Sequence, residues 1–159
     1  MKLLFICTHN RCRSILAEAI TNHLSDGVSP TLTARSAGSQ PVGEVHPLSL
    51  KYLVEAGIST QGLCSQSWDE HESWKPDVVI TVCDSAAGEP CPAWFGDAFR
   101  VHWGLADPSH MKGSDDDIAD AFLNTISIIR GRIQSLLTAD TNAMSEVDLV
   151  ALFEKLSQQ

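Results

Sequence analysis

The sequence has 159 residues, with 20 acidic side chains against 11 lysines and arginines, and its formal net charge is -9. This length suits one domain with a buried core, and a mean hydropathy of -0.02 is ordinary for a globular protein. The acidic balance argues against a nucleic-acid partner, and no apolar run approaches the roughly 20 residues of a membrane span. The apolar start is too short for a secretory signal, so we expect a cytoplasmic protein with no membrane partner.

The first half of the chain alternates between strand-like and helix-like patterns. Residues 2–6 are strand-like and apolar from Leu3 onward, and residues 15–24 repeat apolar side chains at the helical period. A second strand is predicted over residues 31–37. A second helix is predicted to begin at Pro47 and to stop near Gly57.

The second half continues the alternation. A short helix is predicted over residues 68–74, a buried strand over 77–83 and a short strand over 99–103. Ser114 precedes three aspartates and caps a long last helix that reaches Leu136. Acidic residues suit a first helical turn, so we interpret the aspartates as helix-start electrostatics rather than as a metal site.

Alternation of strands and helices predicts an α/β fold with a parallel sheet covered on both faces. We expect one domain over residues 1–138 and a C-terminal extension over 139–159. The extension is predicted to form a short helix over 145–156, which docks either on the domain or on another subunit.

The turn after the first strand carries Cys7 and Arg13, separated by five residues. Backbone N–H groups and a helix N-terminus at such a turn favour an anion, and Arg13 can grip two of its oxygens. The positive field is expected to lower the pKa of Cys7, which would make it a nucleophilic thiolate that accepts a hydrogen bond from Ser14. The alternative is a buried structural cysteine near a surface arginine. The predicted oxyanion-binding loop comprises Thr8, His9, Asn10, Arg11, Cys12, Arg13 and Ser14.

Five cysteines make an odd number, which indicates catalytic or redox thiols rather than a disulfide framework. The sequence contains no Cys-x-x-Cys motif and no histidine pair at zinc-finger spacing, so no metal is predicted.

Cys83 ends a buried strand, as Cys7 does, and both thiols should reach the carboxyl edge of the sheet. Cys91 follows eight residues later, across a segment of small side chains. If that segment were helical, the two cysteines would lie about 12 Å apart along the axis. A disulfide needs Cα atoms within about 7 Å, so pairing requires the segment to bend or unwind. The pair therefore indicates transient oxidation, although Cys83 also suits a plain core position.

Asp107 lies in a loop after the strand predicted over 99–103. A carboxyl group there is placed to give a proton to a leaving oxygen above the loop. The alternative is that the Asp107-Pro108 dipeptide only forms a turn.

Together these residues resemble the arsenate reductases built on the low-molecular-weight protein tyrosine phosphatase fold. The resemblance covers residues 2 to about 137. It rests on four segments: residues 7–14, Ser36-Ala37-Gly38, the Cys83 and Cys91 pair, and His102-Trp103-Gly104 with Asp107-Pro108.

The resemblance implies a three-layer fold with a four-stranded parallel sheet, and reduction of arsenate to arsenite in arsenical resistance. Cys7 would attack arsenate, Cys83 would then attack Cys7, and Cys91 would take over the disulfide. Arg13 would hold the oxyanion and Asp107 would be the general acid. Thioredoxin, or glutaredoxin with glutathione, would reduce the final disulfide, and no bound cofactor is implied. Phosphate and sulfate would compete with arsenate.

The family's potassium-site pattern is only partly matched, at Asn10, Glu18 and Ser36, and residues 64–67 do not complete it. Cys12 and Cys64 have no required role, although Cys12 is placed to pair with Cys7 under oxidation.

Two other functions remain open. A low-molecular-weight phosphotyrosine phosphatase would use the same loop, but those enzymes carry tyrosines after the Asp-Pro, and the only tyrosine here is Tyr52. A non-catalytic oxyanion sensor would need the loop and Arg13 but none of the further thiols.

Overall fold

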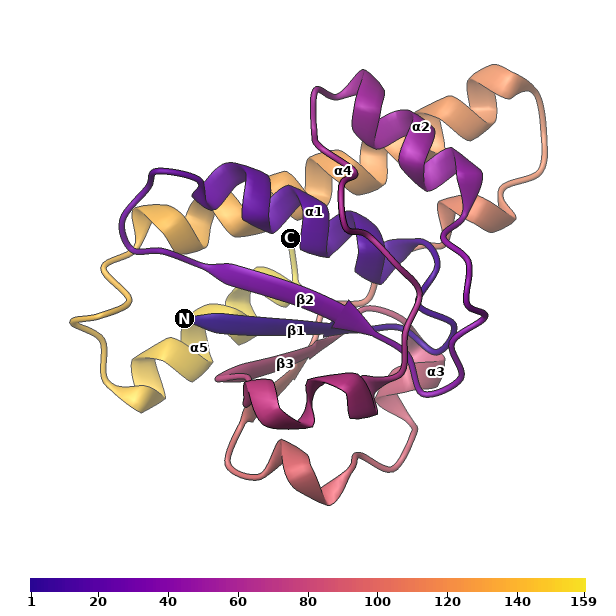
Figure 1. Ribbon diagram of the computed structural model, residues 1–159. Helices are drawn as coiled ribbons and strands as arrows, with labels where there is room; N and C mark the ends of the chain where they lie inside the picture. Colours follow the sequence, from indigo (N-terminus) through magenta and orange to yellow (C-terminus); the bar gives the residue numbers. More distant parts are fainter.

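The computed structural model describes all residues from 1 to 159 and contains one four-stranded sheet in the order β2-β1-β3-β4 (Figure 1). All three strand pairs are parallel, as predicted. The strands are β1 Lys2–Ile6, β2 Thr33–Ala37, β3 Val78–Thr81 and β4 Phe99–His102.

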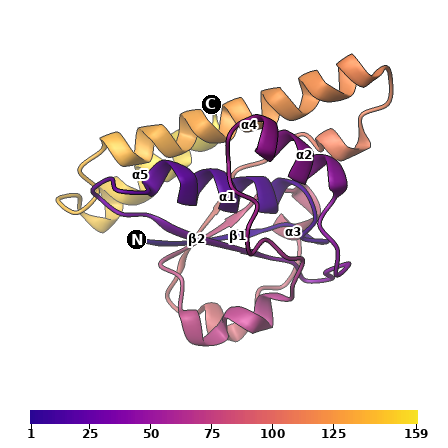
Figure 2. The same cartoon turned by 45° about the horizontal axis from the view of Figure 1, so that its top comes forward.

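Helices cover both faces of the sheet, which confirms the three-layer arrangement. On one face lie α1 Arg13–Ser25, α2 Pro47–Glu55 and α4 Asp115–Thr138, and the short 3₁₀ helices η1 Trp68–Trp74 and η2 Ala93–Phe95 lie on the other (Figures 1 and 2). The remaining elements are α3 Asp84–Ala87, the 3₁₀ helix η3 Pro108–His110 and α5 Glu146–Ser157. No helix has both the length and the apolar character needed to cross a membrane.

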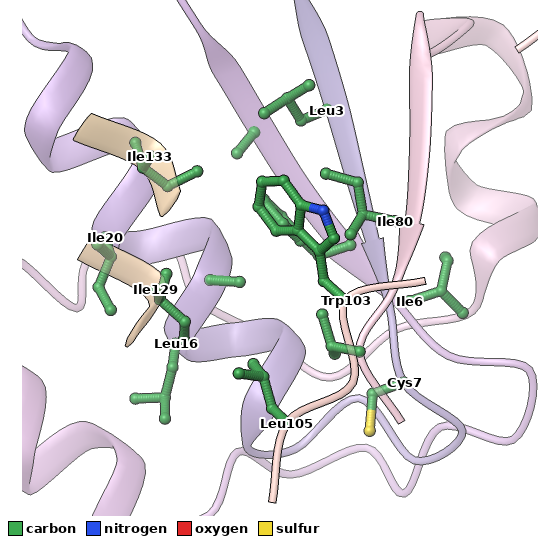
Figure 3. Packing of buried hydrophobic residues seen from close by; sticks show 14 of the residues in the cluster. Leu3, Ile6, Cys7, Leu16, Ile20, Ile80, Trp103, Leu105, Ile129 and Ile133 are labelled. Carbon is green, nitrogen blue, oxygen red and sulfur yellow. The ribbon is translucent and has the colours of Figure 1, made fainter. Parts of the chain in front are cut away.

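The core lies between the sheet and the helices α1 and α4. Leu16 and Ile20 of α1 meet Ile129 and Ile133 of α4 above the sheet, whereas Cys7 lies at the end of the strand, at the margin of this core (Figure 3). Burial of these side chains supplies the main driving force for folding. The apolar cluster therefore fixes the end of β1, where the predicted oxyanion-binding loop (the anion loop, residues 8–14) begins.

The C-terminal helix is present over Glu146–Ser157 and docks on the domain itself. Phe153 is fully buried, stacks on Trp103 with ring centroids 5.7 Å apart, and accepts a 3.0 Å hydrogen bond from the indole N–H at its carbonyl. These contacts hold Trp103 in the core.

The short helix predicted over 68–74 is present with these bounds, as a 3₁₀ helix. The strand predicted over 77–83 is shorter and is regular only from Val78 to Thr81. Val82 still donates a 2.9 Å backbone hydrogen bond to Ile6, so the chain stays extended up to Cys83.

Candidate active site

Three strand ends meet at the carboxyl edge of the sheet, as expected for parallel strands. Cys7 follows β1, Cys83 follows β3, and the loop after β4 leads to Asp107. These residues line a pocket of about 450 Å³. Its full lining is Cys7, Thr8, His9, Arg11, Cys12, Arg13, Val42, Cys83, Ser85, Asp107, Ser109 and His110.

The buried side chain of Asn10 braces the loop between β1 and α1. Asn10 has a φ of 45°, a left-handed conformation that asparagine tolerates better than most residues. Its Oδ1 accepts from the backbone N–H of Gln66 at 2.8 Å, and its Nδ2 donates to Ser14 and Ser36 at 2.9 and 3.0 Å. The proposed bond from Ser14 to Cys7 is absent, because Ser14 is held in this network instead.

Arg13 is the first residue of α1 and reaches across the pocket to the β4 loop. Its Nη1 donates to the Leu105 carbonyl at 3.0 Å and its Nη2 to Asp107 at 2.9 Å. The Nε atoms of Arg13 and Arg11 are buried without a hydrogen-bond partner, and no side chain caps the start of α1. Buried donors without partners are costly, so the pocket is suited to a ligand with several acceptor oxygens.

Asp107 is held as a carboxylate. Burial favours its neutral form, but hydrogen bonds from Ser109 and the Arg13 guanidinium outweigh burial and lower the pKa of Asp107. His110 Nδ1 lies 3.8 Å from the same carboxylate. Asp107 must therefore lose its pairing with Arg13 before it can carry a proton to a leaving group.

The two thiols at the centre of the pocket are coupled. Hydrogen bonding with Cys7 lowers the pKa of Cys83 to about 5, against the effect of burial, and the amides of Thr8 and Ala86 donate to the Cys83 sulfur at 3.4 Å each. The same interaction, together with burial, raises the pKa of Cys7. Our expectation of a lowered pKa at Cys7 was wrong: hydrogen bonding between the two thiols raises the pKa of Cys7 and lowers that of Cys83, so the two thiols titrate as a pair.

The other cysteines lie apart from this pair. Cys91 is half-buried and does not line the pocket. Burial raises the pKa of Cys12 to about 11, which keeps it a protonated thiol at neutral pH. Cys64 is exposed, and its pKa is also raised by desolvation.

The residues of the partial potassium pattern do lie together, but they satisfy one another. Ser36 donates to Glu18 at 2.5 Å and accepts from Asn10, whose own oxygen is used by Gln66. Burial raises the pKa of Glu18 above its ordinary value, which disfavours the carboxylate that a cation needs. The oxygens of Asn10 and Ser36 are thus already engaged in hydrogen bonds, and these residues do not form an open cation site.

Comparisons with known proteins agree with this geometry. The family model described as low molecular weight phosphotyrosine protein phosphatase matches residues 2–148. The chain belongs to this family. An arsenate reductase of Halalkalibacterium halodurans is 35% identical over 132 residues, which cover 82% of this chain and 91% of that protein.

Two further members of the family carry names that specify a reductant. The glutaredoxin arsenate reductase of Synechocystis is 27% identical over 136 residues, covering 86% of this chain and 95% of that protein. The solved structure of a thioredoxin-dependent arsenate reductase from Corynebacterium glutamicum has a TM-score of 0.62 and 30% identity, covering 85% of this chain and 59% of that one. The resemblance to arsenate reductases of the low-molecular-weight phosphatase family is thus confirmed.

Two contacts at the site were not predicted from the sequence. Ser109 holds the Asp107 carboxylate through both its N–H and its hydroxyl, at 3.0 and 2.6 Å. Glu89 accepts a 3.1 Å hydrogen bond from the hydroxyl of Thr8. The only signal for Glu89 was a charged side chain within the otherwise small-residue segment before Cys91.

Proposed function

We propose that the chain reduces arsenate to arsenite through a relay of Cys7, Cys83 and Cys91. The observation that carries this proposal is the placement of Cys7 and Cys83 in one pocket with Arg13, where hydrogen bonding with Cys7 lowers the pKa of Cys83. A phosphatase returns its nucleophile with water and gains nothing from a second thiolate beside it. A reductase needs that thiolate to attack the first sulfur.

In the first step arsenate enters the loop and Arg13 turns from Asp107 to the anion. Cys7 attacks arsenic, an S–As bond forms, and the departing oxygen leaves as water. Asp107, freed from Arg13, takes the proton of the Cys7 thiol and passes it to the departing oxygen. One thiol and one monohydrogen arsenate thus give the S–As adduct and water.

In the second step the Cys83 thiolate attacks the sulfur of Cys7. The S–As electron pair stays on arsenic, arsenite leaves, and a Cys7–Cys83 disulfide forms. Cys91 then attacks Cys83 and returns Cys7 as a thiolate. A dithiol protein of the thioredoxin class is the proposed reductant of the Cys83–Cys91 disulfide, and glutaredoxin with glutathione is the alternative to be tested.

The test is NADPH oxidation coupled to arsenate, with thioredoxin and thioredoxin reductase in one arm and glutaredoxin, glutathione and its reductase in the other. We expect Cys7→Ser, Cys83→Ser and Cys91→Ser each to lose turnover by at least about a hundredfold, with Cys64→Ser as the matched control. No arsenate-dependent turnover in either arm would refute the proposal.

The phosphatase alternative is tested with an aryl phosphate. Tyr52 is buried against Phe122, with ring centroids 4.9 Å apart, and is therefore not placed to stack on an aromatic substrate in the pocket. Fast hydrolysis that persists in Cys83→Ser would favour the phosphatase.

A further inference from the structure

Side-chain contacts hold both ends of residues 84–90, the segment between Cys83 and Cys91. At its start Asp84 contacts His102 Nε2 at 3.1 Å, and at its end Glu89 accepts the 3.1 Å bond from Thr8 of the anion loop. The first contact is open to water, because the Asp84 side chain is 97% exposed. The second lies beside the Cys7–Cys83 pair and is part-buried.

Glu89 is an unusual group to find at this position. Its Oε2 atom is buried without a hydrogen-bond partner. A buried carboxylate oxygen without a donor is costly. The bond from Thr8 therefore holds Glu89 in a position where its Oε2 lacks the hydrogen bonds that water would provide.

The Thr8 hydroxyl has one proton and two neighbouring acceptors. Its oxygen lies 3.1 Å from Glu89 Oε1 and 3.7 Å from the Cys83 sulfur. The shorter distance favours donation of the hydroxyl proton to the Glu89 carboxylate, and the amides of Thr8 and Ala86 donate to the Cys83 sulfur.

Only half of the segment is helical. Helix α3 ends at Ala87, and Gly88 closes the turn with backbone bonds to Asp84 and Ser85. Cys91 is half-buried and packs against the hydrophobic core, outside the pocket that holds Cys83. Bringing Cys91 to Cys83 therefore means lifting residues 88–90, and Glu89 is the side chain of that stretch that is bonded to the anion loop.

We propose that Glu89 is a positioning residue: its bond to Thr8 keeps the segment closed while Cys7 and Cys83 react, and its release admits Cys91. This inference rests on the proposed thiol relay. It assigns the bond between Thr8 and Glu89 a role only in the third step, the attack of Cys91 on Cys83. Cys83 itself is held by β3 and by the amides around its sulfur. Loss of the bond between Thr8 and Glu89 should then speed formation of the Cys83–Cys91 disulfide and favour it at equilibrium, while arsenite release stays the same.

The equilibrium is measured without arsenate, in the full chain carrying Cys7→Ser, against oxidised and reduced dithiothreitol. We expect Glu89→Ala to raise the equilibrium constant for the Cys83–Cys91 disulfide about fivefold, which makes its potential about 20 mV more negative at 29.6 mV per tenfold. Glu89→Gln keeps an acceptor for Thr8 and should lie close to the parent. Glu72→Ala removes an exposed carboxylate elsewhere and should change nothing.

A double-mutant cycle connects the effect to the bond itself. Thr8→Val should raise the same equilibrium constant as much as Glu89→Ala does, and combining the two should add little. If Glu89→Ala fails to fold, Glu89→Asp shortens the side chain by one methylene and should break the same bond. An unchanged or lowered equilibrium constant in the folded Glu89 variant, or full additivity with Thr8→Val, would overturn the proposal.

The kinetic arm separates this inference from the proposed function. In Cys91→Ser, one equivalent of arsenite should be released per chain, at a rate that Glu89→Ala leaves within about twofold. Slower release in the Glu89 variant would overturn the assignment to the third step. Absence of arsenite release in both chains would instead refute the proposed function, and the dithiothreitol equilibrium would still decide the role of Glu89.

Discussion

At the scale of single residues, the two thiols of the pocket have opposite pKa shifts. Hydrogen bonding between them raises the pKa of Cys7 and lowers that of Cys83, and the amides of Thr8 and Ala86 lower the pKa of Cys83 further. The chemistry of the site therefore depends on the pair and not on the intrinsic pKa of either thiol.

This coupling can be tested by titrating the thiolates and following their ultraviolet absorbance at about 240 nm. The reduced protein should show one thiolate with a midpoint of about 5, absent in Cys83→Ser. Cys7→Ala should raise the midpoint, because it removes the largest cause of the shift, and Cys64→Ser should leave it unchanged. A midpoint near the ordinary cysteine value in the wild type would contradict the coupling.

A second prediction concerns the buried His71. Its Nε2 contacts the Ser36 carbonyl at 3.1 Å, and burial holds the pKa of His71 below the ordinary 6.5. The unfolded chain therefore takes up this proton first as the pH falls below about 6.5, and the folded state loses stability there. Above that pH His71 is neutral in both the folded and the unfolded state, so it contributes no pH dependence to the free energy of unfolding.

Urea unfolding between about pH 5 and pH 6.5 should thus show a slope of up to about 1.4 kcal/mol per pH unit from this residue. His71→Gln should reduce the slope. The matched control His23→Gln, at an exposed position, should retain it, and equal slopes in the two variants would contradict the assignment.

At the scale of elements, the start of α1 differs from the starts of the other long helices. Side chains of His46, Ser114 and Ser145 cap α2, α4 and α5, whereas α1 has no side-chain cap. Its first N–H groups are left for a ligand at the anion loop. The loop is held in place by close contact with the end of β2, where a Cβ on Gly38 would lie 2.5 Å from the Thr8 carbonyl oxygen.

Gly38→Ala should therefore disturb the loop as well as the fold. We expect a loss of about 1–3 kcal/mol in the free energy of unfolding, together with weaker phosphate binding. Gly131→Ala is the matched control, because that exposed helical position has nothing within 4 Å of the added Cβ. It should gain about 0.5–1 kcal/mol, and phosphate affinity should stay the same. A Gly38→Ala chain of normal stability and affinity would show that the loop tolerates displacement.

At the scale of the whole molecule, the C-terminal helix completes the core. Phe153 packs on Phe99 and Trp103, and Arg132 of α4 donates to the Ser157 carbonyl at 3.2 Å. The helix α5 thereby covers the strand β4, which leads to the Asp107 loop. The stability of the fold and the position of the Asp107 loop are therefore linked through this one helix.

Phe153→Ala should cost about 3–5 kcal/mol in the free energy of unfolding, measured by urea denaturation. The control Val147→Ala lies on the same helix at 76% exposure and should stay within about 0.5 kcal/mol. A small loss for Phe153→Ala would mean that α5 is only loosely attached.

The sequence predicted the parallel sheet, the long capped helix and the residues around the pocket, because these depend on local periodicity and on strand ends. The charge distribution between Cys7 and Cys83 was not predictable, since it follows from a contact between residues 76 positions apart. The bond between Thr8 and Glu89 spans 81 positions and was hidden for the same reason. The roles of Cys91 and Asp107 in catalysis stay predictions.

The pairing of Arg13 with Asp107 gives the guanidinium a counter-ion within the protein. Any anion that enters has to replace a carboxylate already bonded at 2.9 Å, so binding is an exchange and not a simple addition. Chloride, with one charge and no fixed geometry, gains little from this exchange. A tetrahedral dianion can use the arginine fork and the loop amides together. The site can thus stay open to a scarce oxyanion in a solution full of monovalent salt.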